Sequence, residues 1–194
     1  MKFILLPLVL LFYSYGLWSQ SFDYGITLGG NLYEIQSSGG LQNESGTTKF
    51  KIYVGGYGDY QISDKIGAIL YVAYNQKTLN VGGDVDFSFI DFSPAIKYVP
   101  GSSYSKGFFF ELGPRFSLLS SAEANNTDVK SLYESTNIGI QLGIGYHLLD
   151  YLELLLKLDY GFTALYDVGG TDRTIFGGIL TLNLDINKIL NTLK

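Results

Sequence analysis

The sequence contains no cysteine and little charge, proline or histidine. Its 194 residues include four prolines and one histidine, and Asp, Glu, Lys and Arg together make up 16%. Without cysteine there is no disulfide framework, thiolate metal site or thiol nucleophile. Soluble domains usually carry about 25% charged residues, and the net charge of −5 lacks the basic excess that nucleic-acid binding requires. We therefore expect no nucleic-acid partner and no cofactor.

The chain is instead rich in apolar, aromatic and glycine residues, and it opens on an apolar segment. Hydrophobic residues make up 46%, with 24 glycines, 16 tyrosines and 13 phenylalanines. Lys2 is followed by the apolar run 3–12 and then by small or polar residues such as Ser14 and Gly16. A membrane-spanning helix needs about 20 apolar residues, so this shorter run is typical of a secretory signal peptide. We assign residues 1–19 to it, with cleavage near Gly16 or Ser19.

After residue 20 the hydrophobic pattern alternates with a period of two. Phe22, Tyr24 and Ile26 alternate with Asp23, Gly25 and Thr27, as expected for a strand with one apolar face. Strands that cross a membrane at a tilt need about 9–11 residues. The same alternation predicts eight strands of suitable length, at residues 22–33, 49–62, 66–77, 88–99, 107–119, 136–149, 151–164 and 173–184.

The connections between these predicted strands alternate in length. Longer stretches rich in Gly, Ser, Asn and Asp fall at 34–48, 78–87, 120–135 and 165–172. Tighter turns lie between them, and short turns on one side with longer loops on the other are typical of outer-membrane barrels. We expect a barrel over residues 20–186 and a short C-terminal tail over 187–194.

The two faces of the predicted strands differ in charge. In all eight strands the apolar face holds no Asp, Glu, Lys or Arg, whereas the opposite face holds about a dozen. A soluble lipocalin-like barrel would point the apolar face inward, but its Leu, Ile, Phe and Tyr are too bulky for an eight-stranded interior. A Lys or Arg facing the bilayer centre costs about 2–4 kcal/mol. The sequence therefore predicts an all-β, eight-stranded antiparallel up-and-down transmembrane barrel.

Aromatic residues of the apolar face lie mostly near strand ends. This placement is typical of the girdles at the two membrane interfaces. The predicted interfacial aromatics are Tyr24, Tyr60, Tyr74, Tyr98, Tyr146, Tyr160 and Phe162.

Four segments resemble one known family. They are Phe89-Ile-Asp-Phe-Ser-Pro-Ala-Ile-Lys-Tyr98, Phe110-Glu-Leu-Gly-Pro-Arg-Phe-Ser-Leu-Leu119, Gly139-Ile-Gln-Leu-Gly-Ile-Gly-Tyr146 and Lys157-Leu-Asp-Tyr-Gly-Phe-Thr163. The chain thereby resembles the outer-membrane β-barrel domain family of gram-negative bacteria, which includes the PorT-like proteins. The resemblance implies a small barrel of OmpA/OmpX size in the outer membrane and a link to the assembly of secretion machinery. The last strand departs from such barrels because it does not end in an aromatic residue.

Six charged residues on the polar face are candidates for a lumen network. Buried charges persist when they are paired, so we predict a salt-bridge network that braces the barrel, with an ion path as the alternative. The sole histidine, His147, is interpreted as a polar residue near one end of the lumen. A catalytic role with Ser117 and Asp159 would require an assumed register. The predicted network comprises Asp91, Lys97, Glu111, Arg115, Lys157 and Asp159.

These observations favour a non-enzymatic outer-membrane protein. Its lipid-facing strands would anchor the loops 34–48 and 120–135 outside the cell, where they would contact envelope or secretion-machinery proteins. The role would be structural, adhesive or in assembly. The alternative function is a narrow or gated pore for ions or small solutes, because the lumen face is polar.

Overall fold

Eight long antiparallel strands form a closed barrel. The computed structural model describes residues 21–37, 49–80, 83–101, 103–168 and 171–192, so the expected signal peptide lies outside the described residues. The strand order is β1-β2-β3-β4-β5-β7-β8-β10, and β10 pairs with β1 from Gly25↔Asp185 to Ser37↔Arg173. The barrel strands are β1 (Phe22–Ser37), β2 (Lys51–Gln61), β3 (Ile66–Asn80), β4 (Asp84–Tyr98), β5 (Gly107–Ala124), β7 (Thr136–Leu149), β8 (Leu152–Gly161) and β10 (Thr171–Asp185).

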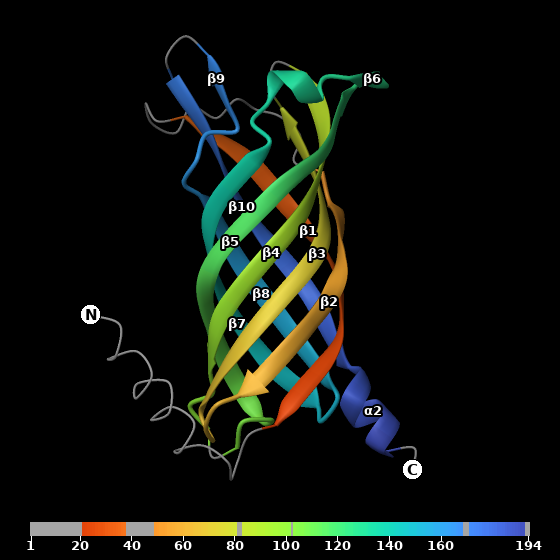
Figure 1. Cartoon of the computed structure of the whole chain (residues 1–194), viewed down its shortest axis with the longest axis vertical. Helices are drawn as coiled ribbons and strands as arrows, with labels where there is room; N and C mark the ends of the chain where they lie inside the picture. Colours follow the sequence, from red (N-terminus) through yellow and green to blue (C-terminus); the bar gives the residue numbers. More distant parts are fainter. Residues whose placement is uncertain (1–20, 38–48, 81–82, 102, 169–170, 193–194) are drawn as a thin grey trace, which may run out of the picture.

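The two ends of the barrel differ (Figure 1). The base is the end where β1 begins and where helix α2 (Ile186–Thr192) follows β10. The rim is the opposite end, which carries the short strands β6 (Thr127–Asp128) and β9 (Tyr166–Val168) and the 3₁₀ turn η1 (Lys130–Leu132). No helix in the described part of the chain is long and apolar enough to span a bilayer.

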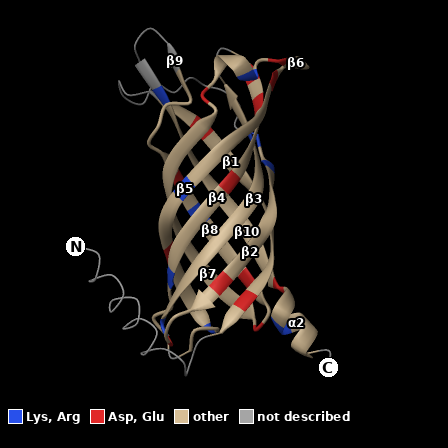
Figure 2. Cartoon of the chain, viewed as in Figure 1, with Lys and Arg blue, Asp and Glu red and all other residues tan. Residues whose placement is uncertain are grey.

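The apolar face of each strand points outward. Leu28, Leu112 and Leu156 are 42%, 53% and 47% exposed, whereas their neighbours Glu111 and Lys157 are buried. Charged residues gather at the two ends and at a few points along the strands (Figure 2). This is the arrangement that lipid around the barrel requires. The predicted transmembrane fold is confirmed, and an inward-facing apolar face is excluded.

Several strands extend further toward the rim than the sequence pattern predicts. Residues 78–87 were expected to form a loop, but β3 reaches Asn80 and β4 begins at Asp84. Here the polarity of the two faces is exchanged. Apolar Leu79 and Val85 point into the barrel, whereas charged Asp86 points outward. Such an inversion suits strands that continue above the lipid, with water outside and an apolar interior.

The same correction applies to the two loops expected to bind partners. The predicted loop 34–48 begins within β1, and residues 38–48 lie outside the described residues. The predicted loop 120–135 is largely structured, because β5 continues to Ala124 and turns back through β6. Asn125 and Asn126 have φ of 49° and 62°, the left-handed backbone that a tight hairpin needs and that Asn tolerates.

Helix α2 replaces the aromatic end that such barrels usually have. Asp185 accepts a hydrogen bond from the Lys188 amide at 2.9 Å, which caps the start of the helix. The Lys188 ammonium lies 3.1 Å from both Asp23 and Asp185. These contacts fasten the tail to the base of β1.

Candidate functional site

The rim end of the lumen is filled by an apolar cluster, here called the rim cluster. Phe87 packs edge-on against Tyr133, with ring centroids 4.7 Å apart, and Tyr133 in turn contacts Tyr166. The cluster draws on β1 to β5, on β10 and on Leu165 after β8, and its side chains fill the lumen at this depth. Its buried members are Tyr33, Tyr53, Ala73, Leu79, Val85, Phe87, Phe89, Leu119, Ala122, Leu165, Ile175 and Ile179.

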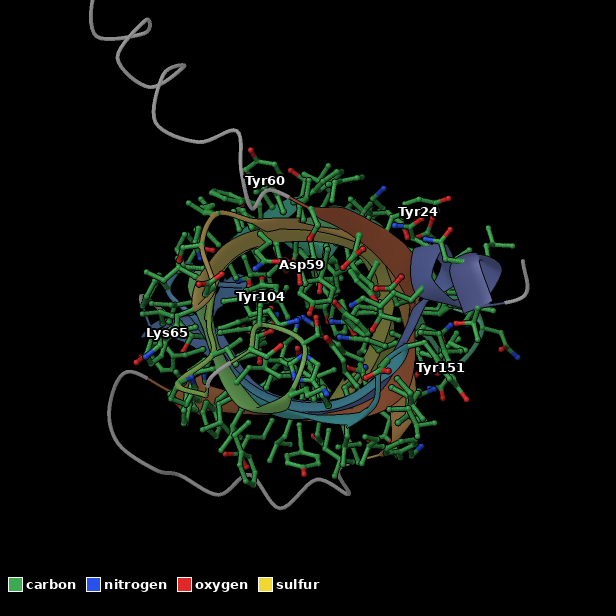
Figure 3. All side chains as sticks on the ribbon, turned by 90° about the horizontal axis from the view of Figure 1, so that it is seen from below. Tyr24, Asp59, Tyr60, Lys65, Tyr104 and Tyr151 are labelled. Atoms are coloured by element: carbon green, nitrogen blue, oxygen red, sulfur yellow. The ribbon has the colours of Figure 1, made fainter. Side chains whose placement is uncertain are left out.

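A second apolar cluster, the base cluster, fills the other end. The connection between β4 and β5 folds inward, so that Val99 and Tyr104 are buried. Viewed from the base, Figure 3 shows Tyr104 and Asp59 inside the barrel, with Tyr24, Tyr60 and Tyr151 outside. The buried members are Tyr57, Ile69, Tyr71, Val99, Tyr104, Phe109 and Leu155.

Between the clusters, Arg115 organises a network at mid-barrel. Its Nε lies 2.8 Å from Asp159 Oδ1, and its second terminal nitrogen donates to Asn137 Oδ1 at 2.7 Å. The guanidinium also bonds Ser117, whose hydroxyl donates to Asp91. Arg115, Asp91 and Asp159 are fully buried. A guanidinium can satisfy several acceptors at once because its donors point in fixed directions.

Neutral side chains complete this mid-barrel network. Tyr33 donates to Asp159 Oδ2 at 2.5 Å, and Asn75 donates to Asp91 Oδ2 at 2.7 Å. Asn31 donates to Asn75 at 2.7 Å. The network thus joins β1, β3, β4, β5, β7 and β8 across the lumen.

A second network lies nearer the base and centres on Lys97. Its ammonium is 3.0 Å from Asp59 and 2.8 Å from Glu153. His147 Nε2 lies 3.0 Å from the same Glu153 oxygen that binds Lys97. Tyr104 donates to Asp59 at 2.6 Å. Burial, followed by the neighbouring Asp59 carboxylate, raises the pKa of Tyr104 well above its ordinary value, so the hydroxyl keeps the proton that it donates.

Glu111 and Lys157 lie between the two networks and are less fully paired. The Lys157 ammonium is 3.9 Å from Glu111 and 3.3 Å from the centre of the Tyr71 ring. Tyr71 donates to one Glu111 oxygen at 2.9 Å. The other Glu111 oxygen and the Ser93 hydroxyl have no hydrogen-bond partner among the described residues. They face a small void of about 10 Å³.

All six predicted network residues are buried in the lumen, but the structure divides them. Asp91, Arg115 and Asp159 come together at mid-barrel, whereas Lys97 belongs to the base network. The pattern had placed Asp59 and Glu153 on the lumen face without revealing that both contact Lys97. That pairing depends on the closed barrel.

Sequence reasoning did not single out Lys77, although it is the last residue of the predicted strand 66–77. Its side chain is fully buried in the rim half of the lumen. The ammonium lies 4.2 Å from the Tyr33 ring centre and 4.7 Å from that of Phe89, and it has no hydrogen-bond partner among the described residues. The signal was available in the alternation of the predicted strand, which puts Lys77 on the same face as Tyr71 and Asn75.

The structure does not bring the conceivable catalytic residues together. His147 belongs to the base network, with Nδ1 3.0 Å from the Gly107 carbonyl oxygen. Ser117 and Asp159 instead contact Arg115 at mid-barrel. In the described part of the chain, no cluster of three or more His, Cys, Asp or Glu residues could hold a metal ion.

Six of the predicted interfacial aromatics are exposed on the outer face, and Tyr74 is partly buried there. Tyr24, Tyr60, Tyr98 and Tyr146 lie near the base, where Tyr60 pairs with Phe22 and Tyr146 with Phe108. The rim half carries Tyr74, Tyr160 and Phe162. Tyr74 contacts the Ser88 hydroxyl at 2.8 Å.

Known barrels share this fold. Neisserial surface protein A (NspA) is 15% identical, with a TM-score of 0.54 over 87% of this chain and 99% of that chain. Ail, the attachment invasion locus protein of Yersinia pestis, is 12% identical, with a TM-score of 0.51 over 84% and 98%; its structure holds the heparin analogue sucrose octasulfate. No curated protein matches the chain. At these identities the likeness concerns the fold alone.

The family comparison covers most of the chain. The family described as "Outer membrane protein beta-barrel domain" matches residues 18–167. The chain therefore belongs to this family of outer-membrane barrels and is a protein of the outer membrane.

Proposed function

We propose that this protein is a closed, non-enzymatic barrel that presents its rim outside the cell. In this orientation the short turns and helix α2 lie at the base, in the periplasm, as in other outer-membrane barrels. The observation that carries the proposal is the filled lumen: apolar clusters occupy both ends and paired charges occupy the middle. Because the lumen is filled, the function is assigned to the surface of the rim.

Conductance distinguishes this proposal from the alternative of a pore. A closed lumen predicts that the purified protein in a planar bilayer stays at the lipid baseline. The polar lumen motivates the alternative, and Glu111 beside the small void is its best-placed residue. Unitary current steps whose ion selectivity changes in Glu111→Gln would establish the pore and overturn the closed barrel.

The rim offers a surface suited to a protein partner. Between Glu123 and Glu134 the exposed charged side chains are three acids, Glu123, Asp128 and Glu134, and one lysine, Lys130, set among exposed Asn, Thr and Ser residues. Leu132 on η1 is 70% exposed. Sucrose octasulfate, bound by Ail, is an anion, and an acidic rim disfavours a ligand of that kind. An adhesive or envelope-assembly role, including the secretion link of PorT-like proteins, fits this surface.

Replacing rim residues tests this role. Residues 130–132, which form η1 and contain no buried residue, would be exchanged for a Gly-Ser segment of equal length, and the base turn 63–65 would be exchanged in the same way as the control. We expect the rim variant to lose adhesion, secretion or envelope integrity while remaining a folded barrel. If the rim and base variants both behave as wild type in all three assays, the rim is not the acting surface.

A further inference from the structure

An apolar groove runs along the outer face of the barrel in its base half. Its volume is about 550 Å³, and none of the residues that line it is charged. Strands β1 to β5 contribute to it. Small or ring-shaped residues line it, namely Ala68, Pro94 and Pro114, together with the larger Leu70, Ile96 and Leu112.

The groove coincides with an interruption in the hydrogen-bonded wall. Strands β4 and β5 pair up to Phe92↔Phe116 and resume at Ile96↔Leu112. That register sets Pro94 opposite Pro114, and proline supplies no N–H to a β-ladder. Gly113 fits here because a Cβ atom at this position would lie 2.0 Å from the Pro94 carbonyl oxygen.

The wall is thin at this interruption. Pro94, Gly113 and Pro114 line both the outer groove and the inner void of about 10 Å³. On the inner side are the Glu111 oxygen and the Ser93 hydroxyl that have no hydrogen-bond partner. Whatever fills the groove therefore determines how well the polar interior is shielded from the membrane.

The base end of the groove has the character of a membrane interface. Phe22 and Tyr60 line it there, and both are exposed on the outer face. Lys65 is exposed in the turn before β3, three residues before Ala68. Figure 3 shows Tyr60 and Lys65 on the outside of the barrel at this end. Aromatic rings and lysine at the end of an apolar surface are suited to lipid headgroups.

We propose that the groove binds one acyl chain of an anionic phospholipid, whose phosphate contacts Lys65. The groove is continuous with the lipid-facing surface, so a chain enters it without leaving hydrocarbon. Its wholly apolar lining matches a hydrocarbon chain, and Lys65, exposed in the turn that leads into β3 at the base end, offers a cation to a phosphate. The bound lipid covers the Pro94–Pro114 interruption.

Quenching by brominated lipid tests the proposal. The only tryptophan of the chain is Trp18. With Trp18→Phe in every variant, an introduced tryptophan is a unique probe wherever the signal segment is cleaved. Leu112→Trp places the probe in the groove, and Leu180→Trp places it on β10, where the leucine is similarly exposed (53% and 48%). Each variant is inserted into phosphatidylcholine vesicles containing a small fraction of brominated phosphatidylglycerol.

We expect quenching to be several-fold stronger for Leu112→Trp than for Leu180→Trp. Adding Lys65→Glu, or filling the groove with Ala68→Phe, should reduce it to the Leu180→Trp level. Equal quenching at the two positions would overturn the proposal, as would equal quenching by brominated phosphatidylcholine at the same fraction. A groove probe shielded from both lipids would overturn it in favour of a protein partner. If Leu112→Trp fails to fold, Ile96→Trp on the other side of the interruption serves as the groove probe.

Discussion

Two buried cations of the lumen are held in opposite ways. Arg115 has a carboxylate, an amide oxygen and a hydroxyl within bonding distance. Lys77 has aromatic rings on two sides and no hydrogen-bond partner among the described residues. Substitution by methionine should therefore destabilise the protein at Arg115 but not at Lys77.

Arg115→Met should strongly destabilise the barrel. The substitution leaves Asp159 and Asp91 buried without the cation between them, and breaking a buried ion pair in this way costs about 3–5 kcal/mol. Urea unfolding of the protein in lipid vesicles, followed by tyrosine fluorescence, measures the free energy of unfolding. A loss below about 1 kcal/mol, typical of an exposed pair, would show that Arg115 does not organise the network.

Lys77→Met should leave the barrel as stable as wild type or stabilise it. An unsatisfied buried polar group costs about 1–3 kcal/mol, and methionine fills a similar space between the Tyr33 and Phe89 rings without that cost. The same unfolding measurement applies, with Arg115→Met as the matched comparison. A large loss of stability would mean that the attraction of Lys77 to the rings and to the mid-barrel carboxylates outweighs its desolvation.

At the scale of elements, the packing of β5 against β4 depends on a residue without a side chain. A Cβ atom at Gly113 would meet the backbone of Pro94 and Ala95, whereas one at Gly178 on β10 would lie 3.8 Å from its nearest neighbour, a Lys157 oxygen. Overpacking costs about 1–3 kcal/mol or more, so Gly113→Ala should lower the free energy of unfolding while Gly178→Ala should not. Equal effects of the two substitutions would argue against close contact at the interruption.

Helix α2 is held by a charge that depends on pH. Burial lowers the pKa of Lys188, but Asp23 and Asp185 outweigh this effect and hold the pKa above its ordinary value of roughly 10.4. Since the raised pKa belongs to the folded state, the charged Lys188 stabilises the helix fully at neutral pH. This stabilisation is lost as pH rises from the ordinary pKa of lysine through the raised pKa of the folded state. The helix should therefore detach in strong alkali.

A spin label measures this detachment, because the cysteine-free chain gains a unique label site through Leu190→Cys. The spectrum should show slow motion at neutral pH and faster motion as the lysine deprotonates. In Lys188→Ala the label should move quickly at every pH. A label at the end of β7, at Leu149→Cys, controls for unfolding of the barrel itself. If its motion changes in step with the first label, the pH effect is not specific to α2.

At the scale of the whole molecule, closure gives each of the eight barrel strands, as the structure describes them, a neighbour on both sides. The β1–β10 ladder completes the ring, so the detergent SDS meets no open edge of a barrel strand at which to begin unfolding. An outer-membrane fraction should therefore show a band on an SDS gel that migrates differently before and after boiling. Identical migration of boiled and unboiled samples would contradict a closed barrel.

The architecture could be predicted from sequence because lipid requires every strand to present an apolar, uncharged face to the outside of the barrel. Residues 136–149 form a strand with the predicted ends, since apolar side chains alternate with polar ones over its whole length. The predicted strand ends were wrong near the rim, where the apolar Leu79 and Val85 point inward instead of toward lipid. A prediction that expects the same face to be apolar along the whole strand therefore ends the strand where the apolar side chains change face.

The lumen contacts could be predicted only in part. Alternation alone puts Lys97 and Glu153 on the inner face, but their contact joins residues 56 positions apart. Which partner each charge meets depends on the stagger of all eight strands, and local pattern carries no information on that stagger. The groove escaped prediction for the same reason, because it exists only where Pro94 and Pro114 come into register.

The bonds that cross the lumen have a consequence for folding kinetics. Tyr33 and Asp159 are 126 positions apart, and Tyr71 and Asn183 are 112 apart. Such contacts join early strands to late ones, so we expect them to form only as the ring closes, after the costly pairing of distant strands. Interactions that are absent from the transition state slow unfolding without hastening folding. The buried polar network should thus lengthen the lifetime of the inserted protein and leave the speed of its assembly to the lipid-facing strands.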